Sequence, residues 1–89
     1  MADIVKKGAR GEDVKQVQEG LNRLGFGLAT DGVFGDATYN AVITLQMIFG
    51  YDADGIVGPA TRKLMESQAG YGWNLQAARK AFVQKQPQA

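Results

Sequence analysis

The chain has 89 residues, enough for one small domain, and 45% of them are hydrophobic, so it can form a core. It contains no cysteine and no histidine, which excludes disulfides, the commonest zinc ligands and any Ser-His or Cys-His nucleophile. Ten basic and nine acidic residues give a net charge of +1 without the basic stripe typical of nucleic-acid binders. No apolar run approaches the roughly 20 residues needed to span a bilayer. We therefore expect no metal, no cofactor, no nucleic-acid partner and no membrane insertion.

The first eleven residues predict an extended arm. Ile4 and Val5 are followed by a lysine pair and by Gly8 and Gly11, which interrupt regular structure. This start lacks the basic segment and the long apolar stretch of a secretory signal peptide. We therefore expect synthesis in a cytoplasm, without that export route.

Residues 12–24 predict the first helix. Glu12 and Asp13 fall in its first turn, where carboxylates suit the positive end of a helix. One apolar stripe recurs at i, i+3, i+7 and i+10: Val14, Val17, Leu21 and Leu24. Gly25 provides the stop. Gly20 costs about 1 kcal/mol inside a helix relative to alanine, and we interpret it as a point of close packing.

An eight-residue motif occurs twice, and five of its eight positions are identical. We call the two copies the first turn unit (Asp31-Gly32-Val33-Phe34-Gly35-Asp36-Ala37-Thr38) and the second turn unit (Asp54-Gly55-Ile56-Val57-Gly58-Pro59-Ala60-Thr61). Asp-Gly predicts a tight turn, because the carboxylate can accept backbone amide protons ahead of it and glycine tolerates positive φ. An apolar pair then packs on the core. The second glycine opens a helix, in whose first turn the threonine hydroxyl can satisfy a free backbone group.

The second helix is predicted over residues 36–49 and the third over residues 59–67, with Pro59 at a favourable first position. The predicted core face of the second helix consists of Thr38, Ala41, Val42, Leu45, Ile48 and Phe49. A separate apolar set, Tyr39, Ile43 and Met47, lies elsewhere around that helix and needs a partner or a ligand. Leu64 and Met65 are the predicted inward residues of the third helix.

A glycine-containing break at residues 69–72 precedes a predicted fourth helix from Asn74, its N-cap, to Val83. Leu75, Ala78 and Phe82 share one side of that helix, and we expect it to cover the Tyr39, Ile43 and Met47 set. The predicted fold is all-α. It comprises a compact three-helix domain over residues 1–67 with the two turn units, an additional C-terminal helix over residues 68–83, and the start of a linker at residues 84–89.

The sequence resembles the peptidoglycan-binding-1 domain family over roughly residues 4–66. The resemblance is carried by Val14-x-x-Val17-Gln18-x-x-Leu21-x-x-Leu24-Gly25-Phe26, by both turn units, and by Ala41-Val42 and Leu45-Gln46. It implies a monomeric, non-catalytic module that binds peptidoglycan at the bacterial cell wall and targets an attached hydrolase. The chain looks like the N-terminal wall-binding module of a modular phage endolysin, whose catalytic domain would follow residue 89. Ile43 and Met47 depart from the family pattern, which usually has polar residues there.

A related fold serves as the propeptide of matrix metalloproteases. This leaves an alternative open, a protein-interaction or regulatory module that contacts a partner enzyme.

The candidate ligand-binding residues are Asp31, Gly32, Phe34, Thr38, Gln46, Asp54 and Gly55. We expect the first turn unit and the start of the second helix to line a shallow groove. There Asp31, Gly32, Phe34, Thr38 and Gln46 would offer polar groups beside an aromatic ring, which suits the amides and N-acetyl sugars of peptidoglycan. The alternative is that the turn units only shape the fold, and Phe34 fits a core position equally well. Tyr51, Tyr71 and Trp73 are candidates for stacking on sugars or for anchoring the C-terminal helix.

The acidic residues, six Asp and three Glu, do not predict catalysis. They fall in turns, at helix ends and at solvent-facing positions, where nothing indicates a deep pocket that would raise one pKa. Residues 50–61 also fail as an EF-hand loop, because the twelfth position is Thr61 in place of glutamate. The sequence thus predicts a binding module, not an enzyme.

Overall fold

The computed structural model describes residues 4–77 of the 89-residue chain, and in that range every regular element is helical. Helix α1 spans Glu12–Arg23, α2 spans Asp36–Ile48 and α3 spans Pro59–Gly70. The chain becomes helical again at residues 75–77. The described residues form no strand beyond two isolated bridges. The all-α prediction is confirmed, while the predicted linker and Val83, Ala78 and Phe82 lie outside the described residues.

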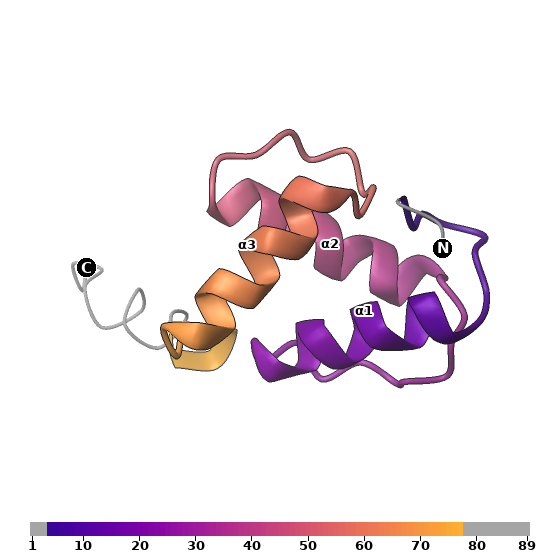
Figure 1. The fold of residues 1–89 in the computed structure, drawn as a ribbon, viewed down its shortest axis with the longest axis horizontal. Coiled ribbons are helices and arrows are strands. Elements are labelled where there is room, and N and C mark those ends of the chain that lie inside the picture. The colour runs from indigo at the N-terminus through magenta and orange to yellow at the C-terminus, as the bar shows by residue number, and fades with distance from the viewer. Residues whose placement is uncertain (1–3, 78–89) are drawn as a thin grey trace, which may run out of the picture.

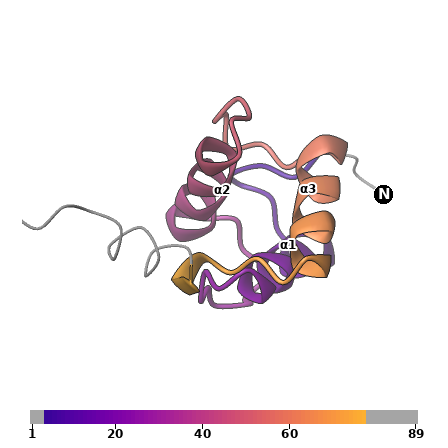
Figure 2. The same ribbon diagram turned by 90° about the vertical axis from the view of Figure 1, so that its left-hand side faces the viewer.

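The three helices run in the same general direction, so their first turns gather at one end of the domain (Figure 1). Each helix therefore needs a connection that returns along the bundle before the next helix begins. Figure 2 shows α2 and α3 on opposite sides, with α1 along the lower edge. The two turn units complete the return connections, because each of them leads into the start of the next helix.

The predicted stripe of α1 is confirmed, because Val14, Val17, Leu21 and Leu24 are all buried. The interpretation of Gly20 is also confirmed. A Cβ atom built on this residue would lie 2.7 Å from the Cε atom of Met65 in α3. The absent side chain therefore lets α1 and α3 approach closely. Leu64 and Met65 are buried, as predicted for α3.

Ile48 was predicted to face the core, and this is wrong, because its side chain is 47% exposed. The residue that is buried near it is polar: Gln46 is 2% exposed. Residues that are two positions apart in a helix point about 200° away from each other around its axis. Burial of Gln46 therefore turns Ile48, the last residue of α2, toward solvent.

Helix α3 ends at Gly70, three residues later than predicted. The left-handed glycine is Gly72, with φ 78°, and not Gly70. The amide of Gly72 donates to the Ala69 carbonyl (3.1 Å) and the amide of Trp73 donates to the Gln68 carbonyl (2.9 Å). This is the Schellman pattern, and α1 and α2 end in the same pattern at Gly25 and Gly50.

The N-terminal arm (residues 4–11) is not extended throughout, as was predicted for residues 1–11, because the Ala9 amide donates to the Lys6 carbonyl (3.0 Å) in a turn. The arm joins both turn units. Val5 exchanges two backbone hydrogen bonds with Val57, at 2.9 and 2.8 Å. Further along the arm, the amide of Gly11 donates to the Gly32 carbonyl (2.9 Å). The arm thus holds the connections before α2 and α3 together at the end where the helices begin.

The segment after α3 docks on the C-terminal end of α1. The amide of Leu75 donates to the Leu24 carbonyl (2.6 Å), and Gln76 Nε2 donates to the Gly25 carbonyl (3.2 Å). Asn74 is the predicted N-cap, and its Oδ1 atom accepts the Gln76 amide proton (2.9 Å). The first two bonds satisfy carbonyl groups at the end of α1, and the Asn74 bond satisfies a free amide at the start of the next helical turn.

The described part of this segment does not cover the apolar face predicted for it. Met47 is 65% exposed, and Tyr39 packs against Gly55 of the second turn unit. Trp73 contacts Phe49 edge-to-face, with ring centroids 5.1 Å apart. The described part of the segment thus lies at the C-terminal ends of α1 and α2, and coverage of the α2 face by residues 78–83 stays a prediction.

Candidate functional site

The first turn unit is organised by Gln18, a buried residue of α1 that was not among the predicted site residues. Its Nε2 atom donates to Asp31 Oδ1 (3.0 Å), to the Val33 carbonyl (3.0 Å) and to Thr38 Oγ1 (3.1 Å). Its Oε1 atom accepts the Gly32 amide proton (2.9 Å). One side chain of α1 thus fixes the turn and the first residues of α2.

The second turn unit repeats this arrangement around Gln46 of α2. Its Nε2 atom donates to Asp54 Oδ1 (3.1 Å), to the Ile56 carbonyl (3.0 Å) and to Thr61 Oγ1 (3.2 Å). Its Oε1 atom accepts the Gly55 amide proton (3.0 Å). The duplication seen in the sequence is therefore a duplication of a complete hydrogen-bond network.

The Asp-Gly turns form as predicted. Asp31 Oδ1 accepts the Val33 amide proton (3.0 Å), and Asp54 Oδ1 accepts the Ile56 amide proton (2.9 Å). The glycines that follow have φ 74° and 72°, at Gly32 and Gly55 respectively. The hydrogen bonds from the Val33 amide and from Gln18 lower the pKa of Asp31 below its ordinary value.

The role predicted for the two threonine hydroxyls is wrong. Neither α2 nor α3 has a side-chain hydrogen bond at its N-terminus. Instead, the Oγ1 atoms of Thr38 and Thr61 accept hydrogen bonds from the Nε2 atoms of the two glutamines. The reason is that a buried glutamine must pair both its donors and its acceptor, and the hydroxyl supplies one of the acceptors.

The structure distributes the seven predicted site residues over three places. Phe34 lies in the core with 1% of its side chain exposed. The others belong to the two networks, where Thr38, Gln46, Gly32 and Gly55 are buried and the Asp31 and Asp54 carboxylates reach the surface. Gln46 was expected beside the first turn unit. This is wrong, because it belongs to the network of the second. Ligand contact by these seven residues stays a prediction.

The sequence contained a signal that could have identified the two glutamines. Val17-Gln18 and Leu45-Gln46 are both apolar-glutamine pairs, and each stands in the helix that precedes a turn unit. The spacing of apolar residues alone would place such a glutamine on the solvent-facing side of its helix. It is buried because the turn unit packs against it and supplies its hydrogen-bond partners.

Each turn unit borders a shallow hollow. The first, of about 190 Å³, has Gln18, Asp31, Val33, Gly35 and Thr38 among its lining residues. The second, of about 280 Å³, has the equivalent Gln46, Asp54, Ile56, Gly58 and Thr61. The hollow at the first turn unit thus has a counterpart at the second. Neither Phe34 nor Gln46 lines the first hollow, and a ligand-binding groove there stays a prediction.

Charged and aromatic groups lie at the rims of these hollows. Lys7 of the arm forms an ion pair with Asp36, and the hydrogen bond between them raises the pKa of Lys7 and lowers that of Asp36. Tyr51 lines the second hollow and is 41% exposed.

The other two aromatic candidates lie in the segment after α3. Tyr71 is 84% exposed and Trp73 packs on Phe49. Trp73 therefore anchors the C-terminal segment and Tyr71 does not.

Within residues 4–77, no group of three or more His, Cys, Asp or Glu side chains is placed to hold a metal ion. None of the helices in this part of the chain combines the length and the apolar character that crossing a membrane requires. The geometry offers hydrogen-bonding groups and exposed carboxylates at two hollows. It is the geometry of a small helical module with duplicated surface features.

Comparison with known proteins assigns the family. Residues 10–65 match the family described as "Putative peptidoglycan binding domain" (PG_binding_1), and the chain belongs to this family. It is 45% identical over 67 residues to a "Probable N-acetylmuramoyl-L-alanine amidase" of Bacillus licheniformis, covering 72% of this chain and 19% of that protein. It is 39% identical over 69 residues to a spore cortex-lytic enzyme of Halalkalibacterium halodurans, covering 76% and 21%. The chain thus spans about a fifth of the length of these relatives.

Solved structures agree with this assignment. The SleB N-terminal domain superposes with a TM-score of 0.71 at 35% identity, covering 78% of this chain and 97% of that one. A Burkholderia AP3 phage endolysin superposes with a TM-score of 0.67 at 39% identity, covering 70% of this chain and 24% of the endolysin.

Proposed function

We propose that this chain is a non-catalytic module that binds bacterial peptidoglycan and holds an attached cell-wall hydrolase on its substrate. The observation that carries the proposal is the family match over residues 10–65 together with the kind of protein in which relatives of this domain occur. The amidase and the spore cortex-lytic enzyme each contain the matched region as about a fifth of their length. The rest of each relative is long enough to hold a separate catalytic domain.

The mechanism of such a module is tethering. A domain that binds the wall raises the effective concentration of its attached enzyme there, so even weak binding is useful. The endolysin assignment is the finer part of the proposal. It is supported by the similarity to the Burkholderia AP3 phage endolysin and predicts a catalytic domain after residue 89 in the parent protein.

We place wall contacts at the rims of the two hollows. Asp31, Asp54 and Tyr51 are exposed there. The carboxylates can accept hydrogen bonds from amides of the stem peptide, and the tyrosine ring offers a face for an N-acetyl sugar.

Sedimentation with purified sacculi tests the binding proposal. The folded chain should appear in the pellet, and sacculi digested to soluble fragments should leave it in the supernatant. The destabilising variant Gln46→Leu, assayed above its melting temperature, serves as the unfolded control. A folded chain that stays fully soluble with intact sacculi would favour the alternative, an interaction module for a partner enzyme.

The targeting part has a separate test. Fusing residues 1–89 to a muramidase catalytic domain should speed lysis of intact walls at low enzyme concentration. It should leave hydrolysis of a small soluble substrate unchanged. Equal acceleration of both reactions would contradict tethering, because effective concentration acts only on a substrate that the module binds.

A further inference from the structure

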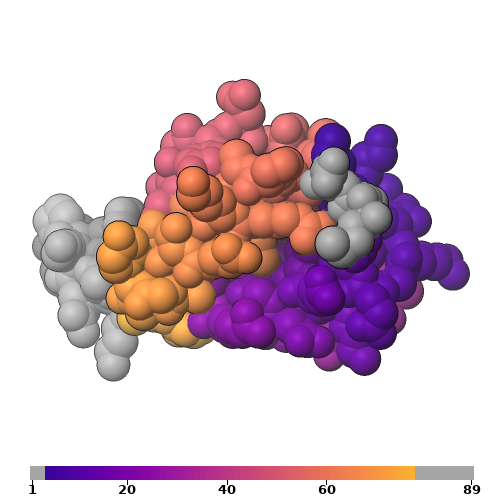
Figure 3. Space-filling view, viewed as in Figure 1, coloured from indigo at the N-terminus to yellow at the C-terminus, as the bar shows by residue number. Residues whose placement is uncertain are grey.

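Another hollow lies away from both turn units, between α1 and α3. Its volume is about 380 Å³. The two helices lie side by side on the face of the molecule seen in Figure 3. Residues lining the hollow are Gln16, Val17, Glu19, Gly20, Arg23, Arg62, Met65, Glu66 and Ala69. Gly20 and Met65, which meet where α1 and α3 approach closely, both line this hollow.

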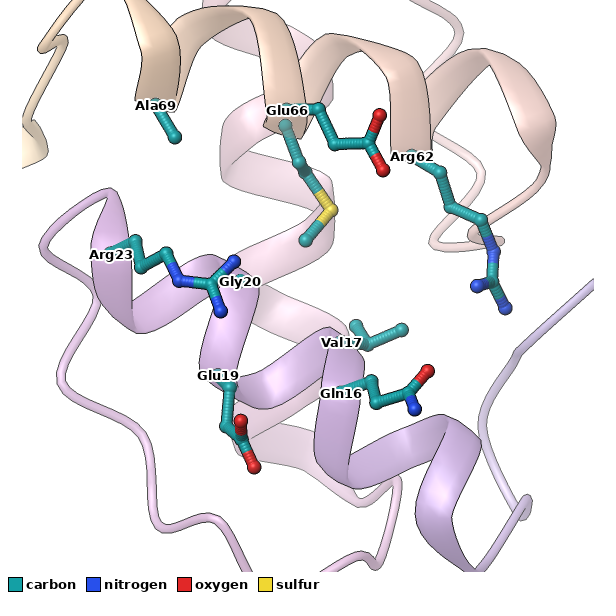
Figure 4. A pocket seen from close by; sticks show the side chains of 9 residues that line it. Gln16, Val17, Glu19, Gly20, Arg23, Arg62, Glu66 and Ala69 are labelled. Carbon is teal, nitrogen blue, oxygen red and sulfur yellow. The ribbon is translucent and has the colours of Figure 1, made fainter.

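Arg62 stands out among these residues. Its Nε and Nη2 atoms are shielded from solvent and have no hydrogen-bond partner. Figure 4 shows its side chain pointing from α3 toward α1, on the side of the hollow opposite Arg23. Glu66 lies one turn further along α3, but the described residues contain no ion pair between the two. A guanidinium group with shielded, unpaired donors is costly unless an acceptor satisfies it.

We propose that this hollow binds the free terminal carboxylate of a peptidoglycan stem peptide, with Arg62 as its principal contact. This inference rests on the proposed function and names the part of the wall that is recognised. Arginine presents parallel N–H donors that match the two oxygens of a carboxylate. Nε and one terminal nitrogen form such a pair of donors, and in Arg62 these two atoms lack a partner.

The remaining lining fits the rest of a short peptide. Val17 and Met65 provide an apolar floor for small side chains. Gln16 can exchange hydrogen bonds with a peptide amide, and Glu66 can pair with an amino group of the ligand. Arg23 adds a second positive charge on the side of the hollow opposite Arg62. A neutral N-acetyl sugar would leave the Arg62 donors without an anionic acceptor, which is why we assign the peptide and not the glycan to this hollow.

Amide chemical shifts of the ¹⁵N-labelled chain provide the test. The probes are a synthetic stem peptide with a free C-terminal carboxylate, the same peptide with a C-terminal amide, and an N-acetylglucosamine oligomer. The free carboxylate should shift amides of α1 and α3 around the hollow. The amidated peptide should bind at least about tenfold more weakly, as expected for loss of a charge-assisted pair.

Two variants make the test specific. Arg62→Gln should weaken binding of the free peptide about tenfold or more, and Arg62→Lys should recover part of it. Lys63→Gln is the matched control, because it removes the same charge from the next, exposed residue of α3 and should bind as the wild type does. Circular dichroism spectra and melting curves establish that each variant is folded.

The outcomes separate this inference from the proposed function. If wild type and Arg62→Gln sediment equally with sacculi, or if the amidated peptide binds as well as the free one, the carboxylate site is refuted while wall binding stands. If shifts appear only with the sugar oligomer, the inference also fails. If the peptide binds but sacculi do not retain the wild type, the stem-peptide assignment is refuted together with the proposed function.

Discussion

Gln18 and Gln46 make the same four hydrogen bonds in two places, each to the turn unit that follows its own helix. Both side chains are almost completely buried, at 1% and 2% exposure. A buried amide is tolerated because its carbonyl and its amino group are both paired. Gln18 attaches α1 to the start of α2, and Gln46 attaches α2 to the start of α3. The same hydrogen-bond network therefore connects each helix to the next one in the chain.

Replacing either glutamine with leucine should destabilise the domain strongly. Gln18→Leu keeps the volume but leaves the Gly32 amide and acceptors in the first turn unit without partners. The expected loss is about 2–4 kcal/mol of unfolding free energy, typical of a broken buried network. Gln46→Leu should cost a similar amount because its bonds are equivalent. Urea unfolding followed by circular dichroism measures both.

Gln16→Leu is the control for this prediction. It makes the same chemical change on an exposed position of α1 and should change the unfolding free energy by less than about 0.5 kcal/mol. Losses below about 1 kcal/mol in both buried variants would show that the networks do not hold the helices together.

The left-handed glycines should differ in their tolerance of alanine. Gly27→Ala meets no atom within 4 Å, so it carries only the backbone penalty at positive φ, about 1–2 kcal/mol. In Gly55→Ala the added methyl group would also overlap the Tyr39 ring. We expect a loss of roughly 2–4 kcal/mol there, with overpacking added to strain.

A second substitution separates the two contributions in Gly55→Ala. With Tyr39→Ala in the background, the overlap disappears, and alanine at position 55 should cost no more than it does at position 27. Thermal melts of the four variants give this comparison. An unchanged penalty in the Tyr39→Ala background would assign the whole effect to the backbone.

The sequence was sufficient to predict the elements that depend on local pattern. The α1 stripe, both Asp-Gly turns and the Asn74 cap were predictable, because each is determined by a few neighbouring residues with characteristic chemistry. The repeat also predicted that two connections would have the same shape. These predictions needed no knowledge of which helices contact each other.

The features that sequence analysis missed depend on contacts between distant segments. Gln18 bonds to residues 13 to 20 positions further along the chain, and a polar side chain in an amphipathic helix is normally assigned to solvent. Burial of Gln46 in the same way rotates α2 and exposes Ile48. The hollow between α1 and α3 was missed because no local pattern relates Arg62 to Gly20.

Stability should fall as the pH is lowered through the acidic range. The pKa of Asp31 is lowered in the folded state by hydrogen bonds to its charged form. Its contribution is therefore present above the unfolded pKa of about 3.9 and is lost as the pH falls through the folded pKa. Asp36, whose pKa Lys7 lowers, acts in the same direction.

Asp31→Asn tests this dependence, because asparagine keeps an acceptor for the Val33 amide and removes the charge. Its melting temperature should be below that of the wild type near pH 7, and the difference should shrink as the pH falls below about 4. Asp52→Asn, at an exposed position before the second turn unit, is the control. A constant difference from pH 7 to pH 2 would exclude the charge as the cause.

The segment after α3 should be part of the folded domain although the family match ends at residue 65. Leu75 is 4% exposed and its amide bonds to Leu24, so Leu75→Ala should cost about 2–3 kcal/mol. Asn74→Ala removes the cap of the next helix and should cost about 1 kcal/mol. Tyr71→Ala, at a position whose side chain is 84% exposed and does not anchor the segment, should cost less than either. Fluorescence of Trp73, the only tryptophan, reports the segment, while circular dichroism reports the helices. Coincident transitions are expected; an earlier fluorescence transition in the wild type would mean that the segment detaches on its own.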